Sequence, residues 1–184
     1  GVQDAYGDEL HHLNEHSIEL ASVWFHHFIG GRDCPIVPVL CGSYQHFISG
    51  VADAAEDETI EAATEYLRSV AAERRTLVIA AADLAHVGPA FGDPGAIAAA
   101  ARANVAAQDA QSISAICDGD AANFLALSTA EGDSRKLCGL PPIYLTLRVL
   151  GITTGKSVGY TQCPADSTGG SIVSIVGVRL YETD

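Results

Sequence analysis

The sequence predicts an α/β fold, a single domain over residues 1–184 in which helices cover both faces of a mixed β-sheet. Apolar runs of strand length alternate with stretches of helical periodicity in the first half of the chain. The order strand, helix, strand between residues 34 and 82 is that of a βαβ unit, whose two strands are parallel neighbours. The last third carries two β-rich runs joined by a Gly-rich turn, which predicts an antiparallel hairpin.

Composition excludes several classes of protein. The chain has 184 residues, of which 48% are hydrophobic and 18% charged, enough for one domain with a real core. A net charge of −13 without a Lys/Arg cluster argues against a nucleic-acid partner. No apolar run approaches the roughly 18 residues of a membrane span. Five cysteines without CxxC spacing predict reduced thiols and a cytoplasmic location.

The first half of the chain contains two predicted strands and two predicted helices. Helical spacing of apolar residues predicts a helix that opens at Glu15–Glu19 and ends at Gly30-Gly31, and a second helix over 56–75. The run 34–40 contains two prolines, which favour an edge strand or interrupted pairing. The run 76–82 is continuously apolar, and we expect it to be a central strand.

The second half is predicted to hold three helices and the hairpin. Asp120 is a candidate N-cap, and two prolines in the first turn suit the start of the last helix. The predicted helices are 96–117, 121–128 and 143–150, and the predicted strands are 156–163 and 171–181. The chain contains no methionine, so we expect either that its start was removed or that it is a portion of something longer.

Three side chains are candidates for chemistry. Asp83 and His86 follow the predicted strand 76–82, at the kind of strand end where sites form. One Asp-x-x-His spacing is a weak signal, and on spacing alone the favoured interpretation is that Asp83 caps a turn beside an incidental loop histidine. Cys138 stands just before a helix N-terminus, which favours the thiolate. The alternative for Cys138 is a small buried apolar residue.

Five short motifs occur in an order that resembles the Memo-like family, which includes bacterial and archaeal proteins labelled AmmeMemoRadiSam system protein B. They are Glu-His-Ser-Ile-Glu at 15–19, Pro-Ile-Val-Pro-Val-Leu-Cys-Gly at 35–42, Asp-x-x-His-x-Gly at 83–88, Cys-Gly-x-x-Pro-Ile at 138–143 and Asp-Ser-Thr-Gly at 166–169. The family is similar in fold to the class III extradiol dioxygenases, non-haem iron enzymes that open catechol rings. The resemblance therefore implies a pocket able to hold a metal.

The resemblance also implies roles for individual residues. His86 falls on the family's pocket histidine, an acid/base residue in the related dioxygenases, and with Asp83 it forms the candidate catalytic pair. Cys138 falls where those dioxygenases have a carboxylate iron ligand, so Cys138 and His86 are the candidate metal ligands. A thiolate with an imidazole suits copper, iron or zinc.

The segment at 15–19 adds three candidate pocket residues, Glu15, His16 and Glu19, of which His16 is expected to line or support the pocket. Two positions depart from the family pattern, Ala85 before the histidine and Gly170 after the Asp-Ser-Thr-Gly turn. The chain resembles the C-terminal part of a Memo-like protein, without the family's N-terminal segments of His-Ala-Gly-Tyr and Gly-x-x-His type. It therefore supplies part of a metal site.

Two functions follow as hypotheses. In the first, the pocket binds one redox metal, iron or copper, with a small-molecule ligand, and performs metal-dependent oxidoreductase chemistry once a missing segment or a companion chain completes it. In the second, the chain is a non-catalytic binding or assembly subunit of the same fold. Because an incomplete fold leaves apolar surface bare, we expect an oligomer or a companion chain in either case.

Overall fold

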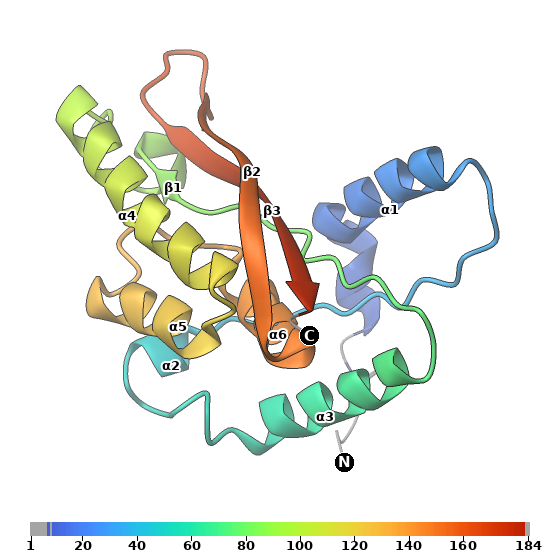
Figure 1. Ribbon diagram of the computed structural model, residues 1–184. Coiled ribbons are helices and arrows are strands. Elements are labelled where there is room, and N and C mark those ends of the chain that lie inside the picture. Colours follow the sequence, from blue (N-terminus) through green and yellow to red (C-terminus); the bar gives the residue numbers. More distant parts are fainter. Residues whose placement is uncertain (1–6, 8, 183–184) are drawn as a thin grey trace.

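The computed structural model describes residue 7 and residues 9–182 (Figure 1). Its elements are η1 (Glu9–Asn14), α1 (His16–Ile29), α2 (Gln45–Ile48), α3 (Glu58–Ala72), β1 (His86–Val87), η2 (Pro89–Phe91), α4 (Ala99–Cys117), α5 (Ala121–Ala130), α6 (Leu140–Leu150), β2 (Thr153–Pro164) and β3 (Ile172–Glu182). Helices and a small sheet make up the chain, which confirms the predicted α/β class.

Side-chain caps fix where three of the helices begin. Glu15, Asp57 and Asp120 each accept a hydrogen bond from a backbone N–H in the first turn of α1, α3 and α5. Gly30, at φ 63°, ends α1 in the left-handed conformation that glycine adopts without strain. These helices and α4 agree with the sequence predictions to within a few residues, because capping and periodicity are local properties.

The sheet is antiparallel throughout the described chain, with strand order β1-β3-β2. Strands β2 and β3 form the predicted hairpin, in which Tyr160 lies opposite Val176. The two-residue strand β1 pairs with the start of β3, and His86 lies opposite Val173. Strand β3 therefore fixes the position of the segment that carries His86.

The predicted parallel strands 34–40 and 76–82 are wrong as strands. Both segments are unpaired in the structure, so the sheet is not the mixed sheet expected from a βαβ unit. Pro35 and Pro38 deprive the first segment of two N–H donors. The segment 76–82 has no strand beside it among the described residues, and an apolar run becomes a strand only when a neighbour accepts its hydrogen bonds.

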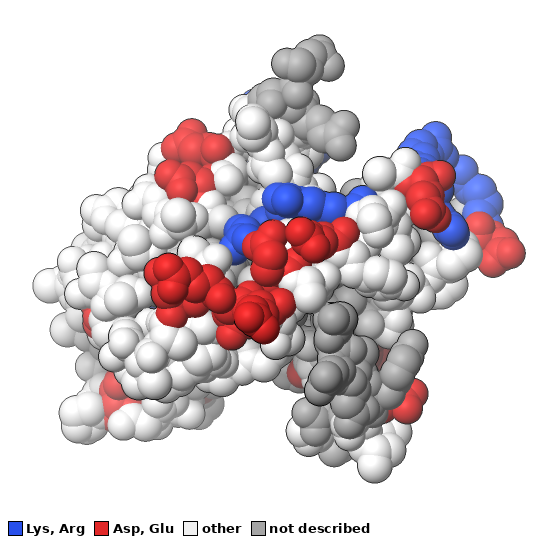
Figure 2. All heavy atoms as spheres, turned by 90° about the horizontal axis from the view of Figure 1, so that it is seen from below, with Lys and Arg blue, Asp and Glu red and all other residues white. Residues whose placement is uncertain are grey.

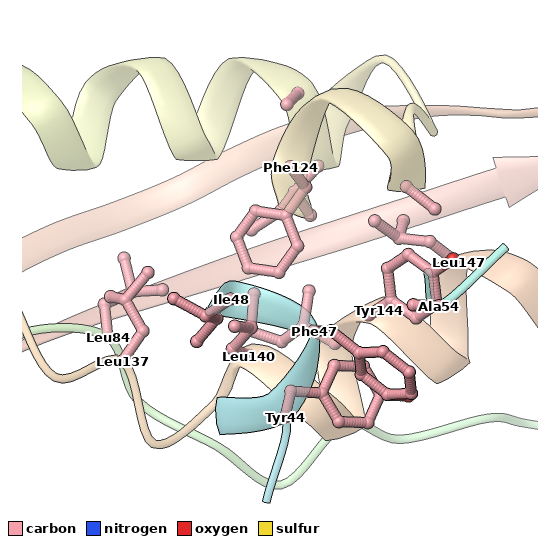
Figure 3. Packing of buried hydrophobic residues seen from close by; sticks show 14 of the residues in the cluster. Tyr44, Phe47, Ile48, Ala54, Leu84, Phe124, Leu137, Leu140, Tyr144 and Leu147 are labelled. Carbon is pink, nitrogen blue, oxygen red and sulfur yellow. The ribbon is translucent and has the colours of Figure 1, made fainter. Parts of the chain in front are cut away.

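The core lies between the hairpin and the helices on one side of it. Helix α4 packs on β2 and β3, α5 packs on α4, and α6 packs on α5 and α3. Phe124, fully buried, points from α5 toward Leu140 at the start of α6, and Tyr44 packs edge-on against Tyr144 (Figure 3). Alternate side chains of β3 on the other face, including Ile175 and Tyr181, are exposed.

Candidate metal centre

Three side chains that could bind a metal meet beside β1. Ligand atoms of Asp83, His86 and Cys138 all lie within 4.8 Å of one another. The Asp83 Oδ1 atom is 2.5 Å from Cys138 Sγ and 3.6 Å from His86 Nε2. The His86 and Asp83 side chains are 18% and 32% exposed, so the group opens to the surface on one side.

The segment that carries Asp83 and His86 is anchored by its neighbours. Leu84 and Ala85 are completely buried, and the Leu84 N–H donates to the Ser174 carbonyl of β3 over 2.9 Å. The His86 N–H donates over 2.7 Å to the carbonyl of Arg135. Burial on one side and hydrogen bonds on both sides hold this segment in place.

The loop that carries Cys138 is fixed by a buried ion-pair cluster. The Arg135 guanidinium, 3% exposed, binds the carboxylates of Asp109 and Glu131 and the Ser112 hydroxyl. Because the carbonyl of Arg135 also accepts from His86, and Cys138 follows three residues later, the cluster sets the position of both metal-ligand candidates. The loops also touch: a Cβ on Gly139 would lie 2.2 Å from the Asp83 carbonyl oxygen.

The imidazole of His86 is oriented with one nitrogen toward the other two side chains. Its Nδ1 lies 3.1 Å from the Leu84 carbonyl, which can only accept, so Nδ1 carries the proton. In the neutral imidazole the lone pair is then on Nε2, the atom that faces Asp83. The Phe91 ring stands edge-on to the imidazole, with ring centroids 4.8 Å apart. This arrangement is typical of metal-binding histidines, whose second nitrogen donates to a carbonyl or carboxylate.

The thiolate expected at Cys138 is not supported. Withdrawal of the sulfur from water, followed by the hydrogen bond to Asp83 and the charge of that carboxylate, raises the pKa of the Cys138 thiol to about 12. The helix N-terminus offers little opposition, since Pro141 and Pro142 remove two of its N–H groups. The thiol therefore keeps its proton at neutral pH until a cation replaces it.

None of the three predicted pocket residues of the 15–19 segment contributes a ligand atom to the group. Glu15 caps α1 through the Ser17 N–H at 2.8 Å, and its charge reaches Cys138, whose pKa it helps to raise. His16 and Glu19 are exposed on α1 and contribute no atom to the group.

Two supporting contacts were missed by sequence reasoning. Asp93 accepts from the Gly88 N–H at 2.7 Å and from Lys136 at 2.6 Å, which ties the His86 segment to the Cys138 loop. The Leu84 carbonyl that orients the imidazole is a backbone atom and leaves no trace in residue identity. The partners Asp93 and Lys136 are 43 positions apart, which no local spacing rule connects.

Gly88 is the position where a single methyl group should disturb the site most. A Cβ there would lie 2.5 Å from the Ser171 Cα, and the backbone has φ 116°. Gly88→Ala should cost about 1–3 kcal/mol of unfolding free energy, through strain and overpacking. Urea unfolding checks it, with Gly95→Ala as the control because nothing lies within 4 Å of that position. Equal stability of the two variants would contradict the close approach of β1 to the β2–β3 turn.

The donor set fits a transition metal. A carboxylate, an imidazole and a thiol suit iron, copper or zinc, and a thiol beside an imidazole does not suit magnesium or calcium. Three protein ligands leave coordination positions for a further ligand, which is the arrangement of reactive rather than closed structural sites.

No helix in the described part of the chain is long and apolar enough to cross a membrane.

Comparison with known proteins places the chain in a family. Searches among curated proteins and among solved structures gave no match. The sequence profile of the family described as Memo-like protein, however, matches residues 3–179, nearly the whole chain. The match covers every element described above except the last three residues of β3, so this chain belongs to the Memo-like protein family.

Proposed function

We propose that Asp83, His86 and Cys138 hold one redox metal, iron or copper, and that the chain carries out metal-dependent oxidoreductase chemistry when a missing segment or a companion chain completes the site. The observation that carries this proposal is the meeting of three ligand atoms within 4.8 Å from segments far apart in sequence. When bound, such a metal supplies one-electron chemistry, for which the protein provides position and electrostatics.

The side chains have separate tasks in this proposal. His86 and Cys138 are the first ligands, and Asp83 either adds an oxygen ligand or accepts the proton that the Cys138 thiol loses. The Leu84 carbonyl keeps the His86 Nε2 lone pair directed into the site. A small-molecule ligand enters from the open side. The reducing cytoplasm is our proposed location, because all five cysteines are free.

Reversible redox change of a bound ion tests the proposal. The full chain is given one equivalent of Cu(II), reduced with ascorbate and reoxidised in air, and the Cu(II) signal is followed by electron paramagnetic resonance. We expect one ion per chain with a signal that disappears and returns, and we expect Cys138→Ser to change its spectrum. The proposal is contradicted if the chain binds no stoichiometric ion, or if Cys138→Ser gives the same spectrum as the unmodified chain.

A second candidate is a non-catalytic binding or assembly subunit. It is favoured by large exposed apolar side chains on α1 and on the unpaired segments, including Trp24 at 60%, Val37 at 71% and Leu77 at 70% exposed. Monomeric soluble proteins rarely leave such a patch uncovered. If the chain binds no metal yet forms a stable complex through this surface, the second candidate is the correct one.

A further inference from the structure

The peptide group between Leu84 and Ala85 orients the imidazole of His86. Its carbonyl oxygen lies 3.1 Å from His86 Nδ1. Its N–H, on the opposite side of the same planar group, donates over 2.9 Å to the Ser174 hydroxyl. Because the carbonyl and the N–H cannot rotate independently, whatever holds the Ser174 hydroxyl also fixes the carbonyl that faces the imidazole.

The Ser174 hydroxyl is held in turn by Tyr160. Ser174 is 0% exposed, and its hydroxyl, which accepts from Ala85, forms a second hydrogen bond with the Tyr160 hydroxyl. Tyr160 donates its own proton over 2.8 Å to the Asp109 carboxylate. Burial, and to a lesser extent Asp109, raises the pKa of Tyr160 to about 12, so the phenol keeps that proton at neutral pH.

The hydrogen bonds continue through a buried ion pair back to His86. Acidic side chains spread over several parts of the face in Figure 2, while basic ones are confined to a central strip and one end. The side chains of Asp109 and Arg135, by contrast, are 0% and 3% exposed and pair with each other. The carbonyl of Arg135 accepts the His86 N–H over 2.7 Å. The network therefore starts at the peptide before His86 and closes on His86 itself.

The donors of this network point in one direction, from Ala85 to Ser174, from Ser174 to Tyr160 and from Tyr160 to Asp109. Hydrogen bonds arranged head to tail strengthen one another where the local dielectric is low. Tyr160 differs from the serine and the aspartate because it is 37% exposed, whereas both of the others are 0% exposed. It is therefore the member whose hydroxyl can be removed with the least disturbance of the core.

We propose that Tyr160 is a positioning residue of the metal centre, which fixes the backbone on both sides of the peptide unit that leads into His86. Tyr160 contributes no ligand atom to the group. Through Ser174, its hydroxyl keeps the Leu84 carbonyl facing His86 Nδ1, and so keeps the Nε2 lone pair facing the other two ligand candidates. This inference rests on the proposed function for its role, although the network needs no metal to form.

Hydrogen exchange on the metal-free full chain tests the network. Tyr160→Phe removes one oxygen atom and keeps the ring. We expect the amides of Ala85 and His86 to exchange about tenfold faster or more, since a hydrogen bond to a charged group is worth about that factor. The amide of Leu147, in the middle of α6 and 1% exposed, should change by less than about twofold, because it reports opening of the core rather than of this segment.

The copper-loaded chain supplies a readout that a purely structural hydroxyl would not move. We expect the electron paramagnetic resonance spectrum of bound Cu(II) to shift in Tyr160→Phe, and the affinity for Zn²⁺ to fall by about tenfold, the size usual for outer partners of a metal site. Tyr181→Phe, on the neighbouring strand and 47% exposed, is the matched control and should change neither. Ser174→Ala should give the changes of Tyr160→Phe, and the double variant should add little, because both act through one network.

The outcomes separate this proposal from its alternatives. Equal acceleration at Leu147 would show that the hydroxyl stabilises the fold as a whole and would overturn the proposal. Unchanged exchange at Ala85 and His86 would overturn it too, as would an unchanged spectrum in a variant that binds copper. A chain that binds no metal would refute the proposed function, and exchange at Ala85 and His86 would still decide whether Tyr160 positions this segment.

Discussion

Replacing His86 by Ala is expected to lower the affinity of the chain for Cu(I) or Zn²⁺ by at least about 100-fold. Even outer-shell partners of a metal site contribute about 10–100-fold, and His86 presents its Nε2 lone pair directly to the group. Cys138→Ala should have an effect of the same size, and the double variant should lose little more, because a two-ligand remnant binds weakly. Competition with a chromophoric chelator measures each affinity.

The controls are residues of the same type elsewhere in the chain. His26→Ala on α1 and Cys34→Ala, both exposed, should leave the affinity within about twofold of the unmodified chain, because outer interactions of a metal site do not extend that far. If His86→Ala and His26→Ala bind the metal equally well, the metal binds elsewhere in the chain and the assigned site is wrong.

Arg135→Met is expected to cost about 3–5 kcal/mol of unfolding free energy, the usual penalty for an unpaired buried charge. The substitution leaves the Asp109 carboxylate, which is 0% exposed, with only the Tyr160 hydroxyl at 2.8 Å as a partner. The loop carrying Cys138 should loosen at the same time, because Arg135 holds it to α4. Chemical denaturation measures the first effect and metal affinity the second.

Two comparisons make this result specific. Arg74→Met, at an exposed position without an ion pair in the described chain, should change stability by less than about 0.5 kcal/mol. Adding Asp109→Leu to Arg135→Met should recover part of the loss, since an apolar pair of similar volume replaces a buried ion pair at little cost. If Arg135→Met unfolds at the same denaturant concentration as Arg74→Met, the cluster does not carry the stability assigned to it.

The parts of the fold that sequence could predict are those set by local interactions. A carboxylate at Glu15 or Asp120 caps the helix that follows it, and the hairpin follows from two β-rich runs and one turn. The segment 76–82 is different, because its apolar run is equally compatible with a strand and with an extended segment that awaits one. Pairing depends on a neighbour, and the described chain provides none.

The candidate site, like the fold, could be predicted from the sequence only where its residues are close together in the chain. Asp83 and His86 are three positions apart, so the sequence alone suggests them as a pair, whereas Cys138 is 55 positions beyond Asp83 and was associated with them only through family resemblance. In the cluster that holds both segments in place, Arg135 of the loop binds Asp109 and Ser112 of α4 and Glu131 at the end of α5. No periodicity or spacing rule connects such residues.

The protonation state of Cys138 shows why position in a helix was an insufficient guide. The helix N-terminus favours a negative charge by a fraction of a kcal/mol to about 1 kcal/mol at exposed positions. A carboxylate oxygen 2.5 Å from the sulfur acts against it at much shorter range. Withdrawal of the sulfur from water and, after it, the Asp83 carboxylate together raise the pKa of the thiol, and neither effect can be recognised without knowing what surrounds Cys138.

The central claim is that Asp83, His86 and Cys138 bind one metal ion together, and X-ray absorption on the full chain loaded with one equivalent of Zn²⁺ tests it most directly. The site predicts one sulfur neighbour at about 2.3 Å and at least one nitrogen at about 2.0–2.1 Å. The sulfur signal should disappear in Cys138→Ala and persist in Cys34→Ala. A first shell of oxygen and nitrogen alone, or a sulfur signal that survives Cys138→Ala, would contradict the claim.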